Sequence, residues 1–140
     1  MKTRLFPLLL ALSGGSVLAV GGAALAAGGS ALQGVLATWQ AAGATGFDAD
    51  RGAALWTAEQ AAPDGGAARS CASCHPADQS QPGRHVRTGE TIEPMSPAAN
   101  PARLTDPAEI EKWLARNCKW TFGRECTPQE KGDLLSFIAR

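Results

Sequence analysis

The sequence has no excess of charge of either sign, because 13 Lys and Arg residues balance 13 Asp and Glu residues. It also has no basic stripe, so a nucleic-acid partner is not expected. The chain lacks any run of alternating apolar and polar residues that would predict a strand, and it has no internal repeat. These absences leave a small all-α domain as the predicted fold class.

A continuous apolar run is found at the N-terminus. A short basic region precedes an apolar stretch over residues 5–20, and Ala24-Leu25-Ala26 fits the A-x-A pattern of a cleavage site. This arrangement predicts a secretory signal peptide over residues 1–26. An uncleaved membrane anchor is the alternative, although glycine pairs and the short apolar stretch disfavour a spanning helix. Residues 27–140 are then expected to form one exported, periplasmic domain.

One motif points to a cofactor. Cys71-Ala72-Ser73-Cys74-His75 is the C-x-x-C-H pattern that attaches a c-type haem. The spacing predicts Cys71 and Cys74 as the covalent attachment sites of one haem c, and His75 as the proximal iron ligand. A zinc site is the competing interpretation, but no second C-x-x-C or H-x-x-x-H completes four ligands. Because c-type haem is attached outside the bacterial cytoplasmic membrane, the motif agrees with the predicted export.

The other two cysteines, Cys118 and Cys126, make the count of four even. In an exported protein such a pair most simply forms a disulfide, which here closes a short loop. Two free or metal-binding thiols are the alternative.

Four helices are predicted from apolar residues at helical spacing and from residues typical of helix starts. Gly43 is expected to end the first helix, and Asp48 or Asp50 to cap the second. Asp106-Pro107 and Thr127-Pro128 each combine an N-cap with a first-turn proline. The expected helices lie over residues 32–42, 50–60, 106–117 and 127–138. Residues 76–101 have no helical period and are expected to form a loop against the haem edge.

The glycine at position 52 has no side chain, so another helix could cross closely there. We expect the terminal helix to pack on it through the apolar residues Leu134, Leu135, Phe137 and Ile138.

The distal position of the iron has three candidate ligands. Met95 lies in a proline-stiffened loop of the kind that presents a thioether in electron-carrying cytochromes, or it only packs on the porphyrin. His85 would give two histidine ligands, although its neighbouring arginines favour an exposed loop. Asn117 is the third candidate.

Asn117 continues the apolar helix face that Ile110, Trp113 and Leu114 form. A polar amide aligned with a buried stripe needs a partner. The alternative is an asparagine in a left-handed turn at the helix end. An amide ligand can hold ferric iron but should release the softer ferrous iron, which opens a site for a diatomic gas.

Several further blocks are more specific than C-x-x-C-H. The blocks K-W-L-x-R-N-C, which ends at Cys118, and G-R-E-C, which ends at Cys126, are not shared by ordinary cytochromes c. In these blocks the sequence resembles the sphaeroides haem protein (SHP) family of monohaem c cytochromes. The matching blocks lie at residues 51–56, 70–75, 87–94, 100–106, 111–118 and 123–128. The resemblance implies a small class I cytochrome c-like fold with an extra N-terminal helix and a disulfide near the distal side.

The resemblance also implies a function. Asn117 would be the distal ligand of ferric iron and would leave on reduction, so that oxygen, nitric oxide or carbon monoxide can bind. Trp113, one turn earlier, would form an apolar distal wall, and Cys118 and Cys126 would be disulfide-bonded. Redox partners would include a dihaem cytochrome c and a membrane cytochrome b.

One residue departs from the family pattern. Met95 stands where a family member carries an apolar residue without sulfur, so a conventional six-coordinate electron carrier with Met95 as distal ligand stays the alternative. The sequence does not indicate an enzyme, because it has no second haem motif and no evident acid–base pair near Asn117.

Overall fold

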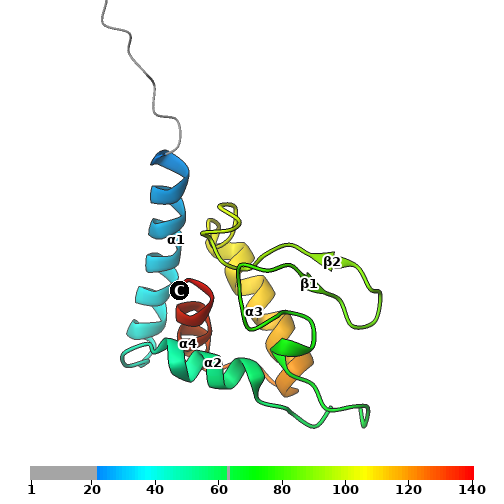
Figure 1. Cartoon of the computed structure of the whole chain (residues 1–140). Helices are drawn as coiled ribbons and strands as arrows, with labels where there is room; N and C mark the ends of the chain where they lie inside the picture. Colours follow the sequence, from blue (N-terminus) through cyan, green and yellow to red (C-terminus); the bar gives the residue numbers. More distant parts are fainter. Residues whose placement is uncertain (1–21, 63) are drawn as a thin grey trace, which may run out of the picture.

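The computed structural model describes residues 22–62 and 64–140, and in this part of the chain four α-helices hold nearly all regular structure (Figure 1). They are α1 (Gly22–Ala41), α2 (Ala49–Thr57), α3 (Pro107–Phe122) and α4 (Pro128–Ile138). A 3-10 turn, η1 (Cys71–Ser73), precedes a small hairpin of β1 (Gly83–Arg84) and β2 (Thr91–Ile92). The predicted all-α fold class is confirmed, and the hairpin is a small addition to it.

The hairpin lies in the stretch that was expected to be irregular. Its two strands are antiparallel, with Gly83 opposite Ile92 and Arg84 opposite Thr91. Two residues per strand are too few to show the alternation of polar and apolar side chains that identifies a strand in a sequence.

The helix starts follow the capping residues. Asp48 accepts hydrogen bonds from the backbone N–H groups of Asp50 and Arg51, so it is the N-cap of α2. Asp106 caps α3 ahead of Pro107, and Thr127 forms a capping box with Glu130 at the start of α4. These side chains satisfy N–H groups that a helix leaves unpaired in its first turn.

α3 is longer than the sequence predicts. It was expected to end near Asn117, but it continues to Phe122 and ends at Gly123, whose φ of 69° is left-handed. Cys118 and Thr121 are buried and extend the packed face of the helix by another turn. The interpretation of Asn117 as a left-handed helix end is therefore wrong, because Asn117 lies inside the helix.

α1 begins at Gly22, earlier than the predicted helix, and ends before Gly43, whose φ is 99°. The predicted signal peptide, residues 1–26, lies outside the described residues except for the short stretch that opens α1. Among the helices in the described part of the chain, none has the length and apolar character needed to cross a membrane.

The core is centred on the crossing of α2 and α4 (Figure 1). As expected, Gly52 lies at the crossing: a Cβ atom there would overlap the Asp133 carbonyl oxygen and lie 2.8 Å from the Phe137 Cβ. A Cβ atom at Gly132 would likewise overlap the ring of Phe47. The four apolar residues predicted for α4 are all buried, namely Leu134, Leu135, Phe137 and Ile138.

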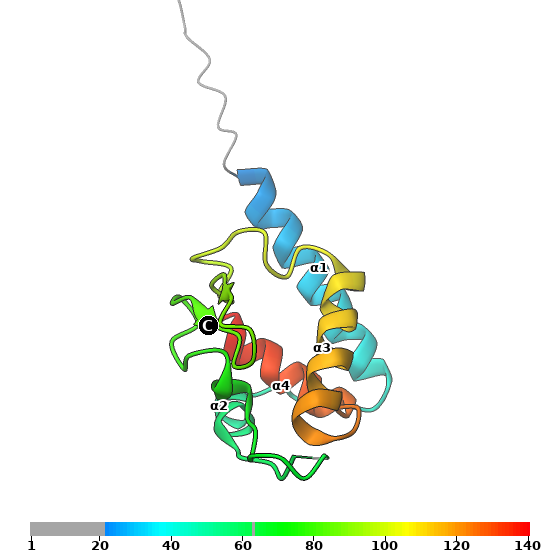
Figure 2. The ribbon, with the colours of Figure 1, turned by 90° about the vertical axis from the view of Figure 1, so that its right-hand side faces the viewer.

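A polar contact of three side chains joins α1, α3 and α4, the three helices whose arrangement Figure 2 shows. The Trp39 indole donates to Glu111 Oε1 at 2.7 Å, and Lys131 Nζ donates to Glu111 Oε2 at 2.8 Å. The Lys131 ammonium also lies 5.5 Å from the centre of a Trp39 ring. Glu111 therefore links α3 to both neighbouring helices.

We predict an acid-sensitive contribution to stability at the start of α4. Arg124 lies 2.7 Å from Glu130 Oε1, and this ion pair lowers the pKa of Glu130 from 4.5 to about 2. Because the folded-state pKa is depressed, the stabilisation is present above pH 4.5 and is lost as the pH falls toward 2. Urea unfolding across this range should show a smaller pH dependence in Glu130→Gln. Glu59→Gln, at an exposed glutamate outside this ion pair, should keep the wild-type dependence.

Candidate haem-binding site

The C-x-x-C-H segment folds into a tight turn. Ser70 and Ser73 form a capping box around η1, and the N–H groups of Cys74 and His75 both donate to the Cys71 carbonyl, at 3.2 and 3.1 Å. The Trp56 indole of α2 donates to the His75 carbonyl at 3.3 Å and its ring lies 5.6 Å from the imidazole. The turn is thus held against the helix core.

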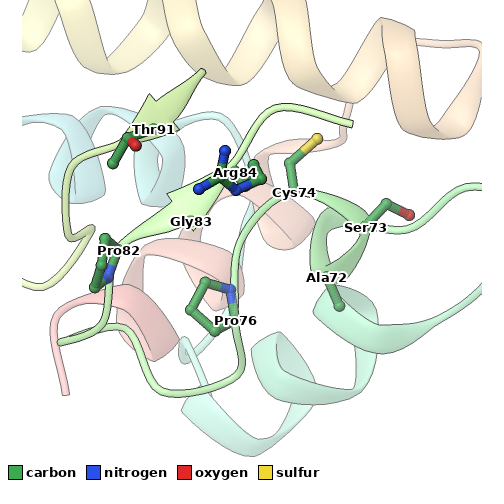
Figure 3. Close-up of a pocket in the computed structure, with 8 residues that line it drawn as sticks. All are labelled: Ala72, Ser73, Cys74, Pro76, Pro82, Gly83, Arg84 and Thr91. Carbon is green, nitrogen blue, oxygen red and sulfur yellow. The ribbon is translucent and has the colours of Figure 1, made fainter. Parts of the chain in front are cut away.

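The hairpin covers the other side of this turn. The Arg84 N–H donates to the Cys74 carbonyl at 2.8 Å. A Cβ at Gly83 would overlap that carbonyl and lie 3.3 Å from the His75 Cα, so only glycine permits this approach. A depression of about 390 Å³ lies beside the turn, with Cys74, Gly83 and Thr91 in its lining (Figure 3).

Cys71 contacts the last turn of α3. Its thiol interacts with the hydroxyl of Thr121, which is 1 % exposed, and burial raises the pKa of Cys71 to about 11. Arg69 makes a second contact, since its guanidinium lies 4.8 Å from the centre of a Trp120 ring. The end of α3 therefore packs directly on the segment predicted to attach haem.

The environment of His75 favours its neutral form. Burial, followed by the positive charge of Arg103, lowers its pKa. A neutral imidazole is the form that binds a metal. Its Nδ1 atom is buried and has no hydrogen-bond partner among the described residues.

The four cysteines divide as the motif predicts. Cys118 and Cys126 form a disulfide with a Cα–Cα distance of 5.6 Å, whereas Cys71 and Cys74 are free. Within residues 22–62 and 64–140, no three His, Cys, Asp or Glu side chains gather as metal ligands would. Two thiols outside the disulfide and a half-buried imidazole that do not form a metal-ligand cluster fit attachment to a ring better than binding of a bare ion.

Asn117 lies on the α3 face that includes Thr121. Residues four apart lie on the same side of a helix, about 6 Å along its axis. Because Thr121 interacts with Cys71, Asn117 projects from α3 one turn away from that contact. The Cys118–Cys126 disulfide, next to Asn117 in sequence, fixes this part of the helix.

Met95 is tethered close to the His75 turn instead. The backbone N–H groups of Met95 and Ser96 donate to the Gln79 carbonyl at 3.0 and 2.9 Å, and Gln79 follows His75 by only four residues. The Met95 side chain is half-buried and packs against the core. Packing against the core accounts for the Met95 side chain in this structure, and its role as the alternative distal ligand stays a prediction.

His85 has a structural place in the hairpin loop. Its ring Nδ1 accepts a hydrogen bond from the backbone N–H of Thr88 at 3.2 Å, and its backbone N–H donates to the Glu90 carbonyl at 2.8 Å. These contacts agree with the loop role expected for His85.

Trp113 differs from expectation. It was predicted to share the buried face with Ile110 and Leu114, but it is 43 % exposed and its indole donates to Glu109 at 2.9 Å. Three residues after Ile110, a side chain lies about 60° around the helix, at the edge of the packed face. Its role as a distal wall stays a prediction.

Two residues of this site were missed from the sequence. Thr121 was left out because α3 was expected to end before it; its i+4 spacing from Asn117 would have placed it on the same face. Gln79 lies in an irregular segment without a motif, so nothing in the sequence distinguishes it.

We expect the disulfide to be a large contributor to stability. Cys118 and Cys126 are eight residues apart, and closing a loop of this length removes roughly 2.5 kcal/mol of chain entropy from the unfolded state. The double variant Cys118→Ser, Cys126→Ser should lose about this much free energy of unfolding in urea titrations. Unfolding midpoints equal to those of the wild type would show that other contacts already constrain the loop.

An all-α domain built around a C-x-x-C-H turn, whose two cysteines lie outside the disulfide and whose imidazole is half-buried, is a c-type cytochrome. Its cofactor is covalently bound haem c. Residues 42–138 match a family model described as a domain of unknown function (DUF1924). Cytochrome c-type protein SHP of Cereibacter sphaeroides is 46% identical over 107 residues, 75% of this chain and 80% of SHP. The chain therefore belongs to the SHP family.

Solved structures agree with this assignment. Oxidised SHP, described as an oxygen-binding cytochrome c, superposes with a TM-score of 0.69 and 44% identity, covering 77% of this chain and 95% of SHP. Oxidised cytochrome c'' from Methylophilus methylotrophus gives a TM-score of 0.68 at 23% identity, covering 81% of this chain and 94% of its own. The second similarity shows a shared fold.

Proposed function

We propose that this protein is a periplasmic c-type cytochrome that binds a diatomic gas at a haem iron whose distal position Asn117 controls. The related SHP is described as an oxygen-binding cytochrome. Bound haem c supplies an iron that changes between ferric and ferrous states and has two axial positions. Cys71 and Cys74 would tether the ring, and His75 would provide the proximal imidazole.

The observation that carries this proposal is the place of Asn117 on α3. It lies one turn from Thr121, which interacts with Cys71, and its helix is separate from the turn that carries His75. An amide oxygen is a hard donor, which suits ferric iron better than ferrous iron. The Asn117 side chain is exposed and makes no hydrogen bond within the described part of the chain, so it can leave without breaking a hydrogen bond to the protein.

Electron exchange completes the proposed function. Reduction and reoxidation of the iron need redox partners, and the family resemblance points to a dihaem cytochrome c and a membrane cytochrome b. Periplasmic location follows from the predicted signal peptide, residues 1–26, and from the usual export of c-type cytochromes.

Carbon monoxide tests the proposal against a Met95-ligated electron carrier. We expect the haem absorption bands of the reduced protein to change promptly when carbon monoxide is added, because Asn117 has left the iron. Met95→Leu should give the same response and the same ferric spectrum as the wild type. A reduced protein that is indifferent to carbon monoxide until Met95 is replaced would establish the electron carrier.

A further inference from the structure

Two buried side-chain atoms in the described part of the chain have no hydrogen-bond partner: Nδ1 of His75 and Oε1 of Gln79. The two residues are four positions apart in the irregular segment that follows η1. The two atoms are also chemically complementary. A histidine that binds iron through Nε2 carries its proton on Nδ1, which makes Nδ1 a donor, whereas an amide oxygen is an acceptor. Buried groups of both kinds are normally paired.

The orientation of the Gln79 amide is fixed by its other end. Its Nε2 donates to the carbonyl oxygen of Pro76 at 2.8 Å and to that of Ala77 at 3.3 Å. Rotating the amide by half a turn would set an oxygen against two carbonyl oxygens, so this assignment of oxygen and nitrogen is the stable one. Oε1 must therefore face away from these carbonyls, and at 7 % exposure Gln79 cannot turn it to solvent.

The backbone holds Gln79 beside His75. Pro76, whose carbonyl anchors the amide, directly follows His75. The Gln79 carbonyl itself receives the N–H groups of Met95 and Ser96, which ties the turn to the following loop. The amide is thus part of a fixed arrangement that is anchored at the residue next to His75.

The charged group that faces His75 does not compete for this contact. Arg103 is near enough for its charge to contribute, after burial, to the lowered pKa of His75. A guanidinium has five donors and no acceptor, so Arg103 cannot receive the Nδ1 proton. Its own donors are directed to the carbonyls of Glu93 and Pro94, both at 3.0 Å.

We propose that Gln79 is a positioning residue whose Oε1 accepts the Nδ1–H of His75 when the histidine serves as the proximal ligand. The inference rests on the proposed role of His75. Histidine ligands nearly always donate their second N–H to such an acceptor, which fixes the tautomer and makes the imidazole a stronger donor to the metal. A stronger donor stabilises ferric iron relative to ferrous iron, so Gln79 lowers the reduction potential.

The test compares the reduction potentials of the haem-loaded wild type with those of Gln79→Leu and Gln79→Glu. Gln79→Leu removes the acceptor and should shift the ferric–ferrous equilibrium toward ferrous iron by about tenfold, which is ~59 mV for a one-electron couple. Gln79→Glu should shift it the other way, because a carboxylate is a stronger acceptor and is repelled by the Pro76 and Ala77 carbonyls. Gln81→Leu, at an exposed glutamine two residues further on, should match the wild type.

The iron–histidine stretching band of the ferrous protein provides a second measurement. Its frequency should fall with Gln79→Leu and rise with Gln79→Glu. Both variants lose the hydrogen bonds that the Gln79 amide nitrogen donates, so a disturbed local structure would shift both in the same direction. Opposite shifts therefore identify the hydrogen-bond acceptor as the cause. Potentials and bands that do not move, or that move the same way in both variants, would overturn the inference and indicate a backbone carbonyl as the acceptor.

The proposed function and this inference can fail separately. If Met95 ligates ferrous iron, the stretching band is absent and carbon monoxide binding fails, yet the potentials still report on Gln79. If carbon monoxide binds promptly and the potentials are insensitive to Gln79, the function stands without this residue.

Discussion

Replacing Asn117 with alanine is expected to raise the affinity of the ferric protein for azide by at least about tenfold. An internal ligand that occupies the distal position nine-tenths of the time leaves the remaining tenth of the molecules open, and the apparent affinity falls by that fraction. The variant should bind azide without this competition. Spectroscopic titration of ferric wild type and Asn117→Ala with azide measures the difference.

Met95→Leu is the matched control for this experiment. Its backbone is tied to Gln79 on the His75 turn, so its side chain is not expected to compete with azide. If Met95→Leu raised the affinity and Asn117→Ala left it unchanged, the assignment of the distal ligand would be reversed. A ferric spectrum that changes in Asn117→Ala before azide is added would support the same assignment independently.

Gly52→Ala should cost more than about 3 kcal/mol of unfolding free energy. The new Cβ would overlap the Asp133 carbonyl oxygen, lie 2.7 Å from its carbon and meet the Phe137 Cβ. These are backbone or near-backbone atoms, so no flexible side chain can move aside, and α2 must separate from α4. Urea unfolding followed by circular dichroism and by haem absorption should show a lower midpoint for both signals.

Gly34→Ala is the control for the helix-propensity part of this change. Gly34 also lies inside a helix, but nothing stands within 4 Å of the Cβ it would gain. Alanine there should stabilise the protein by roughly 0.5–1 kcal/mol. Similar effects from the two substitutions would mean that the α2–α4 crossing can relax.

Local chemistry made most of the fold predictable. Asp48, Asp106 and Thr127 are N-caps because their oxygens reach N–H groups two or three residues ahead, a contact that depends on nearby residues alone. The helix crossing at Gly52 was predictable in the same way, since a glycine between apolar helical positions predicts a close crossing. The disulfide followed from cysteine count and export.

The features that could not be predicted from the sequence depend mostly on contacts between segments that are distant in the chain. The extra turn of α3 is stabilised where Thr121 meets Cys71, a residue fifty positions earlier in the chain. Trp113 is an exception with a local cause: its spacing matched the apolar face, but a hydrogen bond to Glu109, four residues earlier in the same helix, holds it at the edge of that face. The Gln79 carbonyl fixes the Met95 loop through backbone atoms, which carry no sequence pattern.

The contacts that hold α3 in place bear on how fast Asn117 would leave the iron on reduction under the proposed function. Glu111 fastens the helix to α1 and α4, and the disulfide at Cys118 fastens it again two turns later. A helix held at two levels does not slide, which leaves the Asn117 side chain as the part that moves. Rotamer changes of exposed side chains take picoseconds to nanoseconds, whereas helix displacements take microseconds to milliseconds. The proposed opening is therefore expected to finish before a gas molecule arrives, so diffusion rather than protein motion would set the speed of the response.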